Sequence, residues 1–415
     1  MEEKDIVSMS IKEIKRLHLI QTHIENKLKQ TEVAKLLGLS TRQIRRIVRR
    51  VTKEGERGIM HRGRGRASNR RIDQKIREEA LRLYKKHYSD FGPTLASEKL
   101  LERDGISLSD ETLRLWLIEE KISYKRRKPR AHRKWRERKQ HKGEMIQIDG
   151  SHHDWLEGRG PYMVLMGYID DATGNVFGRF YPYEGTIPAL DSFKRYIRKY
   201  KIPVSVYLDK HTTYKASRKA TIDDELNNRP PRSQFERAMA ELGVRVIHAN
   251  SPQAKGRIER LFNTFQDRLI KEMRLAGVDT MEEANRFLNR YLPTYNRRFS
   301  VAPAKGLDLH RSIPSEININ SVLSIKEERV VRNDWTISYK NNFYQILEKV
   351  RVKKVTVEEW INGGIHVSSK GRALPFKKIT RRVQKKVSKI KWYKSTAHPP
   401  KEGHPWKGYH KADVA

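Results

Sequence analysis

The spacing of apolar residues changes twice along this chain, and these changes limit what it can fold into. From residue 11 to about 121, apolar residues recur at helical intervals. From 145 to about 275, runs of strand length alternate with helical patterns, and after 325 short strand-like runs dominate. A single domain does not combine all three patterns, and 415 residues leave room for several domains. We therefore predict a multidomain protein.

The predicted domain boundaries follow these changes in pattern. We expect a first helix-turn-helix domain at 1–60, a basic Arg-Gly linker at 61–71, a second helix-turn-helix at 72–123, a basic linker at 124–143, an α/β core at 144–275, a helical linker at 276–325, a small β-barrel at 326–376 and a basic tail at 377–415. The fold class is thus all-α, then α/β, then all-β.

The first helical region has the signature of a helix-turn-helix. A short helix ends at Gly38, and Ser40 starts the next helix with Gln43 three residues later, as in a capping box. Apolar residues share one face of this last helix, and arginines share the opposite face. These arginines are Arg42, Arg45, Arg46 and Arg49. We expect them to read DNA, and the alternative is a solvated basic face.

A short Arg-Gly segment follows this domain. Arg62, Arg64 and Arg66 alternate with glycines, which keep the backbone thin. Such a segment suits insertion into a narrow minor groove, and a flexible basic linker is an equally good interpretation.

Residues 72–121 repeat the helical plan. Helices are predicted at 72–86, 94–103 and 110–120, with a turn at Gly105. The last helix carries only Arg114 as a basic residue, so we expect it to serve packing or backbone contact and not base reading.

The charge balance indicates a polyanionic partner. Lys and Arg number 88 against 50 Asp and Glu, a net charge of +38. Nucleic acid is the first candidate, because no apolar run reaches the roughly 18 residues of a membrane-spanning helix. The absence of cysteine excludes disulfides, thiolate catalysis and Cys-ligated zinc. The start of the chain lacks a secretion signal, so we expect an intracellular protein that works beside DNA or RNA.

Two basic segments flank the core and the barrel. The linker at 125–142 is either a solvated tether or a phosphate clamp. Basic residues from Lys377 to Lys389 and apolar residues from Ile379 to Ile390 recur at helical spacing. This pattern predicts an amphipathic basic helix after the barrel, and the alternative is a disordered basic tail.

The central region predicts an RNase H-like α/β fold. Strands are expected at 145–148, 162–169, 176–183, 204–208 and 244–248, and helices at 187–200, 233–242 and 254–274. Three strands joined as hairpins, followed by strands that alternate with helices, are typical of this architecture.

Three carboxylates stand out by their position in that pattern. Asp149 ends the first strand, Asp209 ends the fourth, and Glu259 lies in the first turns of the long last helix. In an RNase H-like sheet these two strand ends are neighbours and the helix crosses them. Converging carboxylates repel one another unless a cation joins them, and Mg²⁺ prefers such oxygen ligands. A two-metal site of this kind supports in-line displacement at phosphorus.

The local sequence around these acids resembles a known superfamily. Ile148-Asp149-Gly150, Leu208-Asp209-Lys210 and the run Ser251–Glu259 resemble the DDE motif of retroviral integrases and transposases. The chain looks most like bacterial insertion-sequence transposases with an integrase core, the ISNCY-like group. Tyr295-Asn296-Arg297-Arg298 resembles the segment that often follows that core.

This resemblance implies a function and a mechanism. The protein would bind the terminal inverted repeats of a transposon, cut at the 3′ ends by metal-dependent hydrolysis, and join the 3′-hydroxyls to target DNA. Asp149, Asp209 and Glu259 would be the catalytic metal ligands of two Mg²⁺ ions, with Mn²⁺ as a substitute. Lys255 and Arg257 would contact DNA. Joining two ends implies at least a dimer. The resemblance to bacterial transposases further implies a cytoplasmic, nucleoid-associated protein.

The sequence departs from the retroviral pattern in three places. The interval from Asp209 to Glu259 is longer, Lys210-His211 replaces the usual Asn-Gly, and helix-turn-helix units replace the His/Cys zinc module. These differences favour a transposase over a viral integrase and leave the acidic triad intact.

Other polar residues near the acids have less specific interpretations. His152, His153 and His211 could orient water or contact phosphate, and surface histidines without such a role are common. Asp170 and Asp171 are expected to be hairpin-turn residues. Trp155 is expected to pack in the core.

Two other functions compete with transposition. A DNA-binding regulator with a degenerate core has no need of the three acids. A nuclease that only hydrolyses has no need of paired helix-turn-helix units and a barrel. Both features together favour the transposase.

Overall fold

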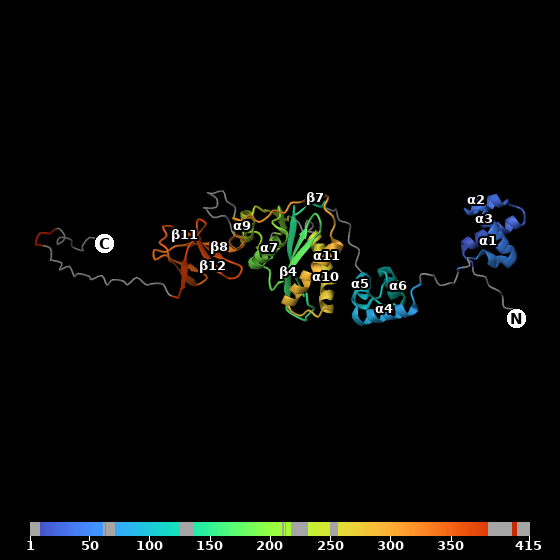
Figure 1. Cartoon of the computed structure of the whole chain (residues 1–415), viewed down its shortest axis with the longest axis horizontal. Coiled ribbons are helices and arrows are strands. Elements are labelled where there is room, and N and C mark those ends of the chain that lie inside the picture. Colours follow the sequence, from blue (N-terminus) through green and yellow to red (C-terminus); the bar gives the residue numbers. More distant parts are fainter. Residues whose placement is uncertain are drawn as a thin grey trace, which may run out of the picture. The chain divides into compact units, whose positions relative to one another are not determined.

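The computed structural model describes residues 9–60, 63, 71–124, 136–209, 211, 213–216, 231–249, 256–380 and 401–404. The chain divides into two compact units, Met1–Lys128 and Pro129–Ala415 (Figure 1). The predicted DNA contacts Arg62, Arg64, Arg66 and Lys255 lie outside the described residues.

The first helix-turn-helix has the predicted three helices. They are α1 (Ile11–Ile24), α2 (Gln30–Leu37) and α3 (Thr41–Glu54), followed by the short 3-10 helix η1 (Gly55–Ile59). Gly38 ends α2 with φ of 62°, a left-handed conformation that glycine adopts without strain. Ser40 caps α3 by accepting a hydrogen bond from the backbone N–H of Gln43. Ile20, Val33 and Ile44 are fully buried and join the three helices in one core.

The second helical group also follows the predicted plan. Its helices are α4 (Gln74–His87), α5 (Pro93–Asp104) and α6 (Asp110–Glu119). Ser109 caps α6, and the buried hydroxyl of Tyr84 donates to the carbonyl of Phe91 between α4 and α5. Leu113 and Leu117 bury one face of α6.

The central sheet has five strands in the order β4-β3-β2-β5-β6. The strands are β2 (Ile146–His153), β3 (Met163–Asp170), β4 (Val176–Tyr181), β5 (Ser205–Leu208) and β6 (Arg245–His248). The pairs β2–β3 and β3–β4 are antiparallel, whereas β2–β5 and β5–β6 are parallel. This is the predicted arrangement of three hairpin-type strands followed by parallel ones.

Helices cover both faces of this sheet (Figure 1). They are α7 (Thr186–Tyr200), α9 (Gln234–Glu241), α10 (Gly256–Leu275) and α11 (Met281–Phe299). Val164 and Met166 of β3 pack with α7 and α9. Met163 and Leu165 pack with α10 and α11 on the other face. Because side chains of a strand alternate between faces, a strand buried on both sides is apolar throughout.

The helix α11 belongs to the core and is not a linker. Its Leu288, Leu292 and Tyr295 share a buried cluster with Trp155 and Phe265. The expected boundary at residue 275 therefore cuts this core too early. The boundary is misplaced because α11 pairs with residues far away in the sequence. The side chain of Asn296 accepts a hydrogen bond from the backbone N–H of Val176 in β4 and donates one to the Val176 carbonyl.

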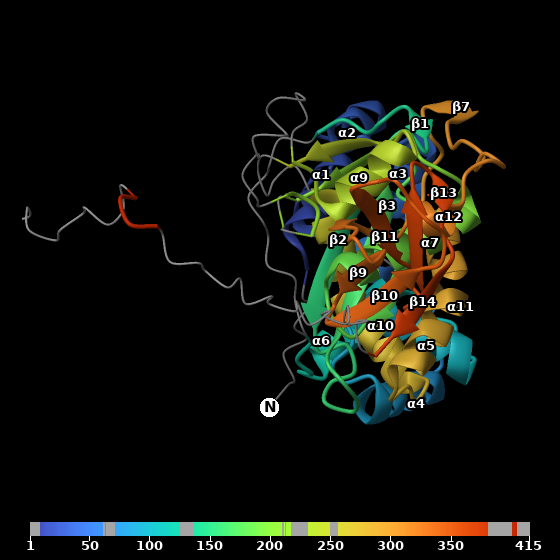
Figure 2. The same ribbon diagram turned by 90° about the vertical axis from the view of Figure 1, so that its left-hand side faces the viewer.

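The C-terminal region forms two small antiparallel sheets around one core. Their orders are β13-β12-β11-β8 and β14-β10-β9, and β9, β10 and β14 lie side by side in Figure 2. The strands are β8 (Ile325–Val330), β9 (Thr336–Tyr339), β10 (Asn342–Ile346), β11 (Lys354–Glu359), β12 (Ile365–Ser369), β13 (Arg372–Ala373) and β14 (Phe376–Ile379). Ile337 and Val357, one from each sheet, are fully buried together. Strand pairing among the described residues does not close a barrel, so the barrel stays a prediction.

Three short elements complete the described fold. They are β1 (His141–Lys142), β7 (Lys305–Asp308) and α12 (Ile319–Val322). The strands β1 and β7 pair in parallel. Within the described part of the chain, no helix is both long enough and apolar enough to cross a membrane.

The predicted tail helix is wrong at its start. Phe376–Ile379 is the strand β14, which pairs with β10. Main-chain pairing with a strand some thirty positions earlier in the chain overrides the helical spacing of side chains. The remainder of that predicted helix, 381–390, lies outside the described residues.

The cap at Ser40 yields a stability prediction. Ser40→Ala removes the hydrogen bond to the Gln43 N–H and should destabilise α3 locally by about 1 kcal/mol. Hydrogen exchange of the full chain should then show faster exchange in α3. Ser109→Ala removes the equivalent cap of α6 and is the matched control. Unchanged α3 exchange in Ser40→Ala would contradict the predicted contribution of this cap.

Candidate active site

Asp149 lies inside β2 and not at its end. The strand continues to His153, because β3 pairs with it as far as His153↔Met163. The expected end of this strand at residue 148 is therefore too early. Ile146 and Ile148 face α7 and α9. By alternation, Asp149 and Ser151 face α10, and Gln266 of α10 donates to the Ser151 hydroxyl at 3.4 Å.

Asp209 directly follows β5, as predicted. The parallel strands β2 and β5 pair at Ile146↔Val206 and Gln147↔Tyr207, and Asp149 and Asp209 each lie two residues after the second pair. Val206 and Leu208 pack with α7 and α9, so the alternation places Tyr207 and Asp209 on the α10 face as well. The two aspartates thus occupy neighbouring positions on one face of the sheet.

Local hydrogen bonds hold Asp209 in place. Its Oδ1 accepts the backbone N–H of His211 at 2.9 Å. Its carbonyl lies 3.1 Å from Nδ1 of His248, whose Nε2 lies 2.9 Å from Glu236 Oε1. His211 therefore contributes its backbone, and its ring lies 3.1 Å from the hydroxyl of Thr213.

Glu259 occupies the first turn of α10 and is partly exposed. One turn later, Phe262 covers Gly167, the residue of β3 that pairs with Asp149. A Cβ on Gly167 would lie 2.7 Å from Cε1 of Phe262. The absence of a side chain at Gly167 thus lets α10 approach the sheet beside Asp149, and this contact brings Glu259 to the same face.

Glu184 is a fourth acid near the site that the sequence analysis missed. Burial raises the pKa of Glu184; the charge of His211 lowers it, while those of Asp149 and Asp209 raise it. Its Oε2 lies 3.9 Å from Nε2 of His152. Glu184 lies between the end of β4 at Tyr181 and the start of α7 at Thr186. It directly follows the strand expected at 176–183, so the strand-end argument used for Asp209 could have found it.

The carboxyl group of Glu184 lies over Gly150. A Cβ on Gly150 would come within 2.6 Å of Glu184 Oε2. His152, in contrast, is largely exposed, and His153 packs edge-on against the buried ring of Trp155. Trp155 is a core residue as predicted, and its indole donates to the Ser151 carbonyl at 3.1 Å.

The acids are chemically suited to a divalent ion. Asp149, Asp209 and Glu259 are each partly exposed and offer hard oxygen donors. The charges of Asp149 and Asp209 both reach Glu184, so negative charge accumulates here. Among the described residues, no three His, Asp or Glu side chains are already arranged to hold a metal ion.

Asp170 is a turn residue as predicted. Its Oδ1 accepts from the N–H of Thr173 at 2.8 Å and from the hydroxyl of the same residue at 2.9 Å. Its Oδ2 accepts from the N–H of Gly143 at 2.7 Å, which fixes the chain that leads into β2.

The prediction that Arg257 contacts DNA is wrong, because the side chain of Arg257 is buried in the core. Its Nη1 lies 2.9 Å from Oδ1 of Asp171, whose side chain is fully buried. Burial lowers the pKa of Arg257, and the charge of Asp171 opposes that shift. Asp171 is thus an internal ion-pair partner as well as a turn residue.

The arginine face of α3 is exposed. Arg42, Arg45, Arg46 and Arg49 are solvent-accessible, whereas Ile44, Ile47 and Val51 are buried on the opposite side. The predicted amphipathic helix is present, and its role in DNA reading stays a prediction.

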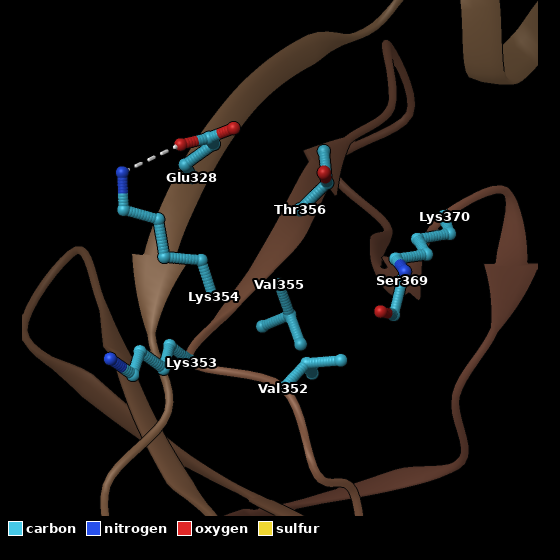
Figure 3. Close-up of a pocket in the computed structure, with 8 residues that line it drawn as sticks. All are labelled: Glu328, Val352, Lys353, Lys354, Val355, Thr356, Ser369 and Lys370. Atoms are coloured by element: carbon cyan, nitrogen blue, oxygen red, sulfur yellow. Dashed lines mark hydrogen bonds and ion pairs between the residues drawn. The ribbon is translucent and has the colours of Figure 1, made fainter. Parts of the chain in front are cut away.

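A shallow pocket in the C-terminal sheets is distinct from these acids. It is lined by residues of β8, β11 and β12 and the adjoining turns, including Lys353, Lys354 and Lys370 (Figure 3). Lys354 pairs with Glu328 at 3.2 Å. No catalytic candidate lines it.

Sequence relatives decide the family. A protein of Sinorhizobium fredii called "Putative transposase y4bF" is 36% identical over 380 residues, which cover 90% of this chain and 82% of the relative. The transposase for insertion sequence IS1202 of Streptococcus pneumoniae is 30% identical over 407 residues, covering 86% and 84%. The chain belongs to the insertion-sequence transposases. Residues 16–78 of this transposase also match the winged helix-turn helix family.

Solved integrase structures are similar to parts of this transposase. The catalytic core of BIV integrase is 18% identical with a TM-score of 0.27, and covers 37% of this chain and 82% of its own. A chain of the simian T-cell lymphotropic virus intasome is 16% identical with a TM-score of 0.32, and covers 74% and 99%.

The contact between Phe262 and Gly167 yields a prediction for the transposase. Gly167→Ala should push α10 from the sheet, cost about 1–3 kcal/mol in stability and lower transposition about 10²-fold through misplacement of Glu259. A plasmid transposition assay and thermal unfolding measure the two effects. Gly306→Ala is the control, because open space surrounds that position. Full transposition by folded Gly167→Ala would refute this role of the contact.

Proposed function

We propose that this transposase is a DDE recombinase. It binds the terminal inverted repeats of its element, cuts at the 3′ ends and joins the freed 3′-hydroxyls to target DNA. The observation that carries the proposal is the position of Asp149 in β2 and of Asp209 directly after the neighbouring parallel strand β5, each two residues beyond the pair Gln147↔Tyr207 and on the face that the helix of Glu259 covers. The activity is that of a polynucleotidyl transferase with endonuclease function.

Asp149, Asp209 and Glu259 would hold divalent metal, with two Mg²⁺ per site and Mn²⁺ as a substitute. When bound, such ions neutralise charge on the attacking and leaving oxygens of an in-line displacement at phosphorus. The HTLV-2 integrase catalytic core, which matches 37% of this chain at 14% identity and a TM-score of 0.28, was solved in complex with magnesium.

The surrounding residues fix the acids for this task. The N–H of His211 orients the Asp209 carboxylate, and His248 holds the backbone of the same residue. Phe262 seats the helix of Glu259 on β3. Fixed carboxylates need no rearrangement when the phosphodiester arrives, which is the advantage of a preorganised site. The acids do not themselves attack phosphorus, so no covalent protein–DNA intermediate forms.

The exposed arginines of α3 supply recognition of the transposon end. The last helix of a helix-turn-helix lies in the major groove, and arginine pairs with guanine through two hydrogen bonds. Arg42, Arg45, Arg46 and Arg49 point to solvent from one helix face. Two transposon ends need two active sites, so the active form is at least a dimer.

Replacement of the acids tests the catalytic proposal. Asp149→Asn, Asp209→Asn and Glu259→Gln keep side-chain shape and weaken metal ligation. Each should abolish cleavage and strand transfer on paired-end DNA while end binding survives in a gel-shift assay. A variant that still cleaves would remove its residue from the triad. Cutting without joining by the unaltered protein would instead indicate a nuclease, and binding alone a regulator.

Replacement of single arginines on α3 tests DNA reading. Arg45→Ala or Arg49→Ala should cost about 1–3 kcal/mol in binding to the terminal repeat and relax specificity at one base pair. Competition binding with cognate and random duplexes measures both effects. Equal losses on the two duplexes would show contact with the backbone alone.

A further inference from the structure

The buried carboxylate of Asp171 joins three distant segments of the second unit. Its Oδ1 accepts hydrogen bonds from Gln147 Nε2 at 2.7 Å, from Arg257 Nη1 at 2.9 Å and from Arg136 Nη2. Its Oδ2 accepts the backbone N–H of Lys139 at 2.9 Å. Asp171 is fully buried, so these partners replace the water that an ionised carboxylate requires.

Arg136 extends this network to a fourth segment, the strand β5. Its guanidinium lies 5.6 Å from the centre of the Tyr207 ring in β5. Its carbonyl accepts from Arg257 Nη2 at 2.8 Å. The network therefore contacts Gln147 in β2, Tyr207 in β5 and Arg257 in α10.

Each of these three contacts lies two residues before one of the acids. Gln147 precedes Asp149, Tyr207 precedes Asp209, and Arg257 precedes Glu259 by the same interval. On a strand, residues two apart share a face and lie about 6.6–6.8 Å apart. On the sheet, the network therefore contacts the residues two positions before Asp149 and Asp209, on the same face as these acids. On α10, it contacts the first turn, which also carries Glu259.

The network also anchors the end of the basic linker. The sequence predicts a tether or a phosphate clamp at 125–142, and the structure shows that residues 136–142 pack on the core. Arg136 and Lys139 bind Asp171, and β1 pairs with β7. The side chain of Arg136 is 38% exposed, against 8% for Arg257 and none for Asp171. Arg136 is therefore the member of the network that solvent and partners can reach.

We propose that Asp171, Arg257 and Arg136 form a latch that positions the three acids, and that Arg136 makes their arrangement depend on docking of the linker that leads to the helix-turn-helix unit. The inference rests on the proposed function. All three members are positioning residues, because they touch the segments that carry the acids and not the reacting DNA. Docking of the linker stiffens the start of α10, and release loosens it.

Arg136→Gln tests the latch in the full chain, since a half-exposed side chain can be replaced without loss of the fold. We expect a 10- to 100-fold lower single-turnover cleavage rate at saturating end DNA. The Kd for end DNA and the melting temperature should stay within twofold and about 2 °C of the unaltered protein. Hydrogen exchange should accelerate at the start of α10, around 256–262.

Arg138→Gln is the matched control. It removes the same charge two residues away. Among the described residues, the Arg138 guanidinium donates to the carbonyls of Asp171 and Ala172, at 3.5 and 3.2 Å, and not to the Asp171 carboxylate. Arg136→Lys keeps the charge and should recover part of the rate. Equal rates and equal exchange in Arg136→Gln and Arg138→Gln would overturn the latch.

The exchange measurement separates this inference from the proposed function. It needs no cleavage, so faster exchange in Arg136→Gln alone supports the latch even if the unaltered protein fails to join ends. Unaltered exchange in an Arg136→Gln protein that still folds refutes it, even if the unaltered protein cuts and joins DNA. Asp171→Asn should accelerate exchange in the same segment more strongly, because it also removes the charge that pairs with Arg257.

Discussion

The parallel pairing of β2 with β5 is the constraint on which the candidate site depends. Strand register fixes side-chain position to within one residue, and a slip by one would turn every side chain to the opposite face. Here the paired residues Gln147 and Tyr207 each lie two positions before an acid, and the apolar residues directly before Asp149 and Asp209, Ile148 and Leu208, face α7 and α9. The burial of those apolar residues therefore also holds the two acids on the face that α10 covers.

The buried side chain of Asp171, just after the end of β3, fixes the position of neighbouring segments in a way that apolar packing cannot. Asp171 has no solvent exposure, and a carboxylate in such surroundings remains ionised only with charged or hydrogen-bonding partners. Arg136, Arg257 and Gln147 meet that requirement. The requirement is directional, unlike hydrophobic burial, so it specifies how the start of α10 and the end of the linker sit on β2. Glu184 has a related position near Asp149 and Asp209, where burial and nearby like charges raise its pKa.

Errors in the sequence-based predictions share one cause. Arg257, expected on DNA, is buried because its partner Asp171 lies 86 positions away in the chain. Residues 377–379, expected in a helix, form β14 because β10 offers a strand to pair with. Residues 136–142, expected in a solvated tether or a phosphate clamp, pack on the core through Asp171 and β7. In each case the local sequence pattern is present, but a partner that is distant in the sequence determines the structure that the segment adopts.

The sequence by itself determined the helices of the N-terminal unit, the order of strands and helices in the core, and the three acids as candidates. Local rules suffice for these, because caps, glycine stops and apolar periodicity act over a few residues. Only the tertiary structure decided that Glu184 lies near Asp149 and Asp209, and that Asp171 gathers Gln147, Arg136 and Arg257. Those relations join residues from separate strands and helices, and they exist only once burial removes the water that each charge would otherwise bind.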